Sequence, residues 1–82
     1  MKLAAGDTYA VLAGDYVGEM WCFIERKENT LCFLSFPNML TREAPFDRFQ
    51  FGVANKIAEK VKKLPKEVFE VVKAQYAKNS NH

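Results

Sequence analysis

Two neighbouring stretches of this chain are apolar at almost every position, and they limit the fold more than any other feature. Residues 20–24 read Met-Trp-Cys-Phe-Ile, and residues 31–36 read Leu-Cys-Phe-Leu-Ser-Phe. Successive side chains of a β-strand point to opposite faces of the sheet, so a strand with one wet face alternates apolar and polar residues. Both faces of these two strands are apolar, so each face needs a cover from the chain or from a partner.

The first half of the chain is predicted to be an antiparallel β-meander. Strands are expected over 8–13, 19–25 and 31–36, with a glycine turn at 14–18 and a hairpin loop at 26–30. In that loop we expect Arg26 to face Thr30 and Asn29 to take the left-handed conformation. The same register predicts three facing pairs: Ile24 with Cys32, Cys22 with Leu34, and Met20 with Phe36.

The second half is predicted to be mainly helical. Two prolines punctuate residues 37–45, which are expected to form a loop. Residues 46–51 fit both a strand and a helix, and we favour a short fourth strand. From residue 53 onward the apolar residues recur with a helical period, which predicts helices over 53–64 and 65–78 that are separated at Pro65. The polar tail over 79–82 is expected to fray.

These elements predict a single α+β domain over residues 1–82. A small, curved antiparallel β-meander of three or four strands, SH3-like in its curvature, occupies about 8–51 in this prediction. The two amphipathic C-terminal helices pack on it. A chain of 82 residues supports only a small core, so association with a second copy would add stability.

The aromatic residues of the two apolar strands are candidates for an interface. Two helices are expected to cover one face of so small a sheet, which leaves the face with Trp21, Phe23 and Phe33 open. Large aromatic side chains are frequent anchors at the centres of protein interfaces, and exposed apolar patches often mark such sites. The alternative is a sheet that curls into a barrel and buries this face. We favour an interface anchored by these three residues.

Basic residues are concentrated in the second half of the chain. Residues 1–41 hold three basic and five acidic side chains, whereas residues 42–82 hold nine basic and five acidic ones. On the predicted helix, Lys56, Lys60 and Lys63 share one face and are candidate contacts to the phosphates of a nucleic acid. A solvated outer helix face explains the same three residues, and we favour that explanation.

Residue types that carry metal or catalytic chemistry are sparse. The two cysteines, Cys22 and Cys32, are not spaced as a zinc motif, and the single histidine is the last residue, so we expect neither a metal nor a cofactor. Both thiols are expected to be reduced, buried core residues in a reducing compartment, and burial should raise the pKa of Cys22. No phosphate-binding glycine loop or nucleophile motif is present in the sequence, so we expect a protein that is not an enzyme.

The N-terminal residues do not read as a signal peptide, because the apolar run Leu3-Ala4-Ala5 ends at Gly6. No stretch is long and apolar enough to suggest a membrane span, so the sequence predicts a cytoplasmic protein that does not bind membranes.

One segment resembles a known motif. Residues 6–24 contain Val11, Gly14 and Gly18 ahead of the second predicted strand. This order of strand, glycine turn and strand resembles the KOW motif of SH3-like barrels in ribosome- and transcription-associated proteins. The resemblance covers less than a quarter of the chain, and it implies binding of RNA or protein through the barrel loops, here residues 14–18.

The sequence therefore predicts a non-enzymatic interaction module that associates with itself, as a homodimer, or with another protein through its aromatic face. A nucleic-acid-binding domain that uses the basic helix face is the alternative. A small enzyme without a recognisable motif is the third hypothesis.

Overall fold

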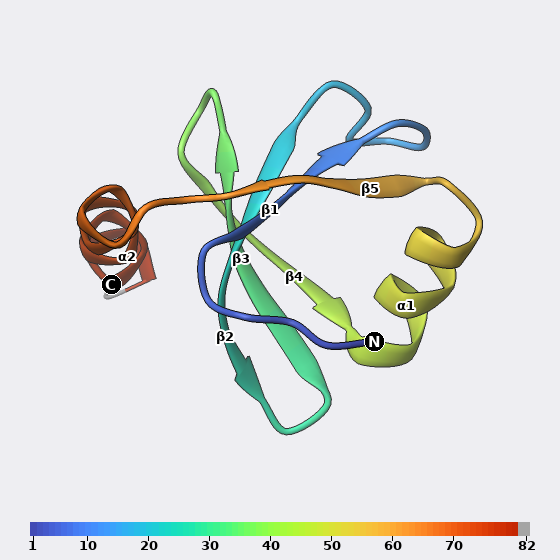
Figure 1. Cartoon of the computed structure of the whole chain (residues 1–82), viewed down its shortest axis with the longest axis horizontal. Coiled ribbons are helices and arrows are strands. Elements are labelled where there is room, and N and C mark those ends of the chain that lie inside the picture. Colours follow the sequence, from blue (N-terminus) through green and yellow to red (C-terminus); the bar gives the residue numbers. More distant parts are fainter. Residues whose placement is uncertain (81–82) are drawn as a thin grey trace.

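The computed structural model describes residues 1–80 and consists of five strands and two helices (Figure 1). Their bounds in chain order are β1 Asp7–Val11, β2 Met20–Lys27, β3 Thr30–Phe36, β4 Leu40–Pro45, α1 Phe46–Ala54, β5 Ala58–Lys63 and α2 Lys66–Ser80. The predicted α+β class is confirmed. Of the tail that was expected to fray, residues 79 and 80 complete α2, and residues 81 and 82 lie outside the described part of the chain.

The five strands form one antiparallel sheet in the order β4-β3-β2-β1-β5. The sheet therefore begins as a meander, but its last strand returns along the chain to pair with the first one. This leaves β4 and β5 as the two edge strands. The expectation of three or four strands is therefore wrong, because β5 joins the sheet as a fifth strand.

The register predicted for the β2–β3 hairpin is confirmed in the half that lies away from the loop. Met20 faces Phe36 and Cys22 faces Leu34. An irregularity between Phe23 and Glu25 then shifts the pairing by one residue, so Cys32 faces Glu25. The predicted pairing of Ile24 with Cys32 is therefore wrong.

The hairpin loop differs from the prediction for the same reason. Lys27, rather than Arg26, faces Thr30, so the loop has two residues, 28 and 29, in place of the three that were expected. The positive φ of 56° belongs to Glu28 and not to Asn29. The extra residue in β2 is thus compensated by a tighter loop.

Three predictions for residues 37–64 are wrong. The expected loop contains β4, the expected fourth strand over 46–51 is the helix α1, and the expected helix over 53–64 is replaced by β5. Only Ala58 of β5 is buried, and the other five residues are exposed. The sequence of this edge strand therefore lacks the alternation of apolar and polar residues by which a strand is predicted. The strand forms because β1 supplies a hydrogen-bonding partner from a distant part of the chain. The helix predicted over 65–78 is confirmed as α2.

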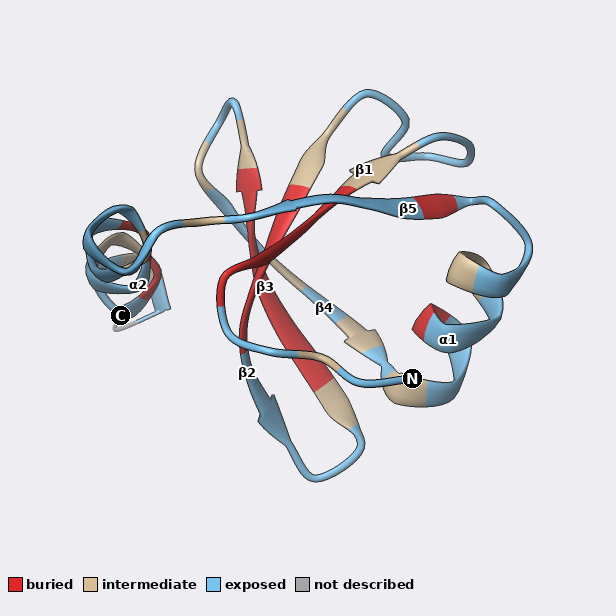
Figure 2. Ribbon diagram, viewed as in Figure 1, coloured by how far each residue is buried: buried red, intermediate tan, exposed pale blue. Residues whose placement is uncertain are grey.

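Each helix covers one face of the sheet, and the two lie on opposite sides in Figure 1. The α1-side cluster consists of Tyr9, Trp21, Phe23, Leu31, Phe33, Phe49 and Ala58. The α2-side cluster consists of Cys22, Ile24, Cys32, Leu34, Val72 and Tyr76. Figure 2 shows buried segments along β1, β2 and β3, and smaller buried patches on β5 and on the two helices. The expectation that two helices would leave one face open is therefore wrong.

Neither described helix is long and apolar enough to cross a membrane. The predicted SH3-like curvature stays a prediction.

Candidate functional site

The three predicted interface anchors lie inside the α1-side cluster. The exposed fractions of Trp21, Phe23 and Phe33 are 8%, 6% and 0%. The ring of Phe33 lies 5.2 Å from that of Trp21 and 4.9 Å from that of Phe49 on α1, measured between centroids. Because α1 was expected to be a strand, its cover over this face was not foreseen. In this structure the three side chains pack against one another and against α1 within one copy.

The three candidate phosphate contacts are not on a helix face. Lys56 lies in the turn after α1, where its φ is 62°, and Lys60 and Lys63 lie on the edge strand β5. The Nζ of Lys60 is 3.3 Å from an Oδ of Asp7, whose side chain is only 3% exposed. Lysines on an edge strand also hinder pairing with strands of other chains. An ion pair within the fold and the protection of an edge strand therefore explain part of the basic cluster without a nucleic acid.

A pocket of about 380 Å³ lies on the α1 side of the sheet, and we call it the loop–helix pocket. It is formed by the loop over 12–19, the end of β4, α1 and the start of β5. Trp21 and Phe49 supply aromatic surface to it, and Asp15 and Arg48 supply charge. Its volume falls in the range that holds a bulky side chain or a small ligand.

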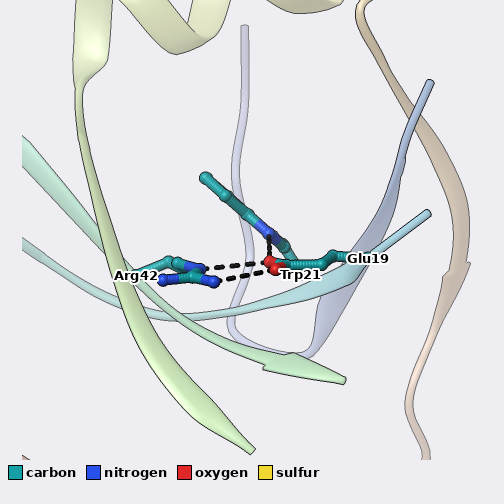
Figure 3. A network of polar contacts seen from close by, with 3 residues as sticks. All are labelled: Glu19, Trp21 and Arg42. Atoms are coloured by element: carbon teal, nitrogen blue, oxygen red, sulfur yellow. Dashed lines mark hydrogen bonds and ion pairs between the residues drawn. The ribbon is translucent and has the colours of Figure 1, made fainter. Parts of the chain in front are cut away.

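A network of polar contacts holds the loop of this pocket (Figure 3). The Nε and Nη2 atoms of Arg42 donate to the two carboxylate oxygens of Glu19, at 3.1 and 2.8 Å. The Nε1 of Trp21 donates to Glu19 Oε1 at 2.8 Å. The hydrogen bonds from Arg42 hold the pKa of Glu19 below its ordinary value. Both partners are about one-fifth exposed, so water screens this pair less than a surface pair.

Arg42 also positions the aromatic side chain of the loop. Its guanidinium lies 4.3 Å from the centroid of the Tyr16 ring, and that ring lies 5.6 Å from Trp21. Gly14 and Gly18 both have a φ of 93°, a conformation that other residues rarely adopt, and they allow the loop to fold back over the strands. The pocket wall is therefore fixed by contacts that link β2, β4 and the loop.

Gly52 of α1 lines the pocket, although neither the backbone nor the packing requires a glycine there. Its φ lies outside the positive range, and a Cβ atom would meet only Ile57, at an ordinary contact distance of 3.8 Å. Glycine in a helix costs up to about 1 kcal/mol relative to alanine. Gly52 thus makes α1 less stable than alanine would, and its lack of a side chain leaves space open in the pocket.

Exposed apolar side chains lie on the segments that form the pocket: Tyr16 and Ile57 line it, and Leu12, Val17 and Phe51 are chain neighbours of residues that line it. They belong to the loop, to α1 and to the turn before β5. Phe51 is 63% exposed and directly precedes Gly52. Exposed bulky apolar side chains on the segments of an apolar pocket are typical of an interaction site.

Within residues 1–80, no three side chains of the His, Cys, Asp and Glu types gather as a metal site. Cys22 and Cys32 are buried and unbridged, and burial raises the pKa of the Cys22 thiol, as expected.

Sequence reasoning did not identify Glu19, Arg42 or Gly52 as members of a site. Glu19 and Trp21 are two residues apart and so share a strand face, which was a usable signal, but the contact with Arg42 spans 23 positions. Comparisons with family models, with curated proteins and with solved structures found no match.

Proposed function

We propose that this protein is a non-enzymatic interaction module that associates with itself through the loop–helix pocket. The observation that carries the proposal is an open apolar pocket lined by Gly52 of α1, together with the 63% exposed side chain of Phe51 on the same helix. The proposal keeps the self-association that was expected from the sequence, but it replaces the buried aromatic face by the surface around α1 as the contact surface.

The proposed occupant of the pocket is Phe51 of a second copy. A two-fold axis beside α1 would place Phe51 of each copy in the pocket of the other, because the same helix carries the protruding ring and the pocket-lining Gly52. Aromatic side chains that fill a pocket at the centre of an interface contribute most of its binding energy. Leu12 and Ile57 would form the apolar surface around this contact.

The contacts of α1 support the SH3-like architecture that the sequence predicted. The helix α1 contacts both edge strands, β4 and β5, and so bridges the open side of the sheet. In such an architecture the loop over 14–18 is one of the binding loops that the KOW resemblance implies. We include this architecture in the proposal, and its role is to present the loop and α1 to a partner.

Nucleic-acid binding is the second candidate function, and it rests on the exposed lysines of β5 and of the turn before it. Neither Lys56 nor Lys63 forms an ion pair with another residue of the described chain, whereas Lys60 is paired with Asp7. Binding to phosphates weakens steeply with salt, and apolar association does not. Salt dependence therefore separates the two proposals.

The decisive experiment is the molar mass in solution, measured by light scattering over a range of protein concentrations at low and high salt. The proposal expects a mass near twice 9.4 kDa that persists at high salt. Phe51→Ala should raise the dissociation constant of the dimer by about thirtyfold or more. Gly52→Leu, which fills the pocket, should have a similar effect.

Val71→Ala is the matched control, because Val71 is also a largely exposed apolar residue but lies on α2. It should leave the dimer intact. A wild-type monomer at all concentrations, or a dimer that withstands both pocket variants, would refute self-association through this site. Binding of a single-stranded oligonucleotide at low salt that is lost when Lys56, Lys60 and Lys63 are replaced by Glu would favour the second candidate.

A further inference from the structure

Both cysteines of the chain lie beneath α2, on the sheet face opposite the loop–helix pocket. Cys22 and Cys32 are 0% exposed and belong to the α2-side cluster, in which Val72 and Tyr76 are the buried residues of the helix. Burial, followed by a hydrogen bond with Cys32, raises the pKa of Tyr76 to about 12. The helix therefore seals two nucleophilic side chains away from solvent.

The attachment of α2 to the sheet is slight. Only two of its fifteen residues are buried, Phe69 packs partly buried against the same cluster, and Val68 and Val71 are 47% and 69% exposed. Two side-chain contacts of hydrogen-bond type tie the helix to the sheet side of the described chain: Asn79 donates to the carbonyl oxygen of Met39, and Tyr76 meets the thiol of Cys32. The covalent connection consists of two residues between β5 and α2. Elements with few buried contacts open at lower free energy than the rest of a fold.

The sheet has its own support without α2. Its hydrogen-bonded ladder runs through all five strands, and α1 closes the opposite face with Phe49. The α1-side and α2-side clusters have no residue in common. Detachment of α2 would thus uncover one cluster while the other, with Trp21, stays packed.

We infer that α2 opens as a unit while the sheet stays folded, and that this opening makes Cys22 and Cys32 a modification site for small disulfides. In the opened state a thiol loses its proton to solvent, and the thiolate attacks one sulfur of the disulfide. A mixed disulfide forms, the original S–S bond breaks, and the other half leaves as a thiolate.

The modification would also hold the helix open. Because both thiols are 0% exposed beneath α2, the closed structure has no space beside them for an added group. The adduct therefore keeps α2 away from the sheet and leaves Ile24 and Leu34 uncovered. A thiol reductant removes the added group and permits closure, so the cover and the two thiols form a reversible switch.

The test is the rate at which 5,5′-dithiobis(2-nitrobenzoate) labels the native protein, followed by release of the coloured thiolate. Val72→Ala removes part of the buried contact between α2 and the sheet, and it should raise the labelling rate by about tenfold. Val71→Ala, on the exposed side of the same helix, should change it by less than about twofold. Single-cysteine variants Cys22→Ala and Cys32→Ala assign the labelling to each site.

Phe49→Leu distinguishes local opening from global unfolding, because Phe49 belongs to the other cluster. It should lower overall stability without raising the labelling rate. An equal response to Phe49→Leu and Val72→Ala would overturn the inference, since both would then act through global unfolding.

Two further measurements keep the inference testable if Val72→Ala fails to fold. The labelling rate of the wild type should depend on urea concentration much less than global unfolding does, because opening α2 exposes little surface. The labelled protein should also retain the native emission maximum of Trp21, the single tryptophan of the chain, whatever the loss of intensity to the attached nitroaromatic group. A steep urea dependence, or an adduct in which Trp21 is exposed to water, would overturn it.

Discussion

Arg42 and Glu19 lie 23 positions apart in the sequence, and the guanidinium of Arg42 contacts both carboxylate oxygens of Glu19. The same carboxylate accepts a hydrogen bond from the indole of Trp21. This arrangement connects β4 to the residue that precedes β2, and it holds Tyr16 at the side of the pocket. The wall of the proposed binding site thus depends on one ion pair between distant segments.

Glu19→Gln is expected to destabilise the fold by about 1–3 kcal/mol, because it leaves a partly buried guanidinium without its counter-charge. Urea unfolding followed by circular dichroism measures the change. Glu25→Gln is the control, because Glu25 pairs with Lys27 at an exposed site, where ion pairs contribute about 0–1 kcal/mol. Equal effects of the two substitutions would contradict the importance of the Glu19 pair.

The pH dependence of stability should report the same pair. Hydrogen bonds from Arg42 lower the pKa of Glu19 in the folded protein below its ordinary value of 4.5. A lowered pKa contributes stability that is present above the unfolded value and lost as the pH falls through the folded one. The wild type should therefore lose this contribution below about pH 4.5. Thermal unfolding across this range should show a smaller loss in Glu19→Gln than in the wild type.

Gly52→Ala should raise the free energy of unfolding by roughly 0.5–1 kcal/mol and at the same time weaken self-association. The added methyl group improves the helix and narrows the loop–helix pocket. Gln50→Ala provides a control on the exposed side of the same helix. If Gly52→Ala stabilised the fold and left the dimer unchanged, the glycine would have no role in binding.

Phe33→Ala should abolish folding or cost about 3–5 kcal/mol, because Phe33 is fully buried between Trp21, Phe23 and Phe49. Circular dichroism and urea unfolding measure this loss. An interface residue would behave differently, since its truncation would weaken association and leave the monomer folded. A folded, stable Phe33→Ala monomer would therefore restore the original interface hypothesis.

Lys60→Met should destabilise the fold by about 1 kcal/mol, because it removes the counter-charge of a buried carboxylate that is held in β1. The half-exposed position of Lys60 limits the effect. Lys62→Met, on the same strand, should have little effect, since Lys62 forms no ion pair within residues 1–80. Chemical denaturation compares the two variants.

Local sequence patterns determined the parts of the fold that depend on neighbouring residues. The apolar runs and the polar break between them predicted the β2–β3 hairpin and the register of Met20 and Cys22, because a short loop aligns adjacent strands. Pro65 and the apolar period after it predicted α2 in the same way. The burial of both cysteines also followed from their place among apolar neighbours.

Tertiary contacts decided the rest. The pattern of residues 46–51 fits both a strand and a helix, and the strand was favoured; the helix forms because it places Phe49 against Phe33 and Tyr9. Residues 58–63 carry almost no buried side chains, and they become a strand only because β1 offers a free edge. The loop–helix pocket draws on segments from 11 to 58, so its existence could not be read from any one of them. Local periodicity depends only on residues that are close in the sequence. The cover of each sheet face and the pocket are formed by residues that meet only when the whole chain has folded.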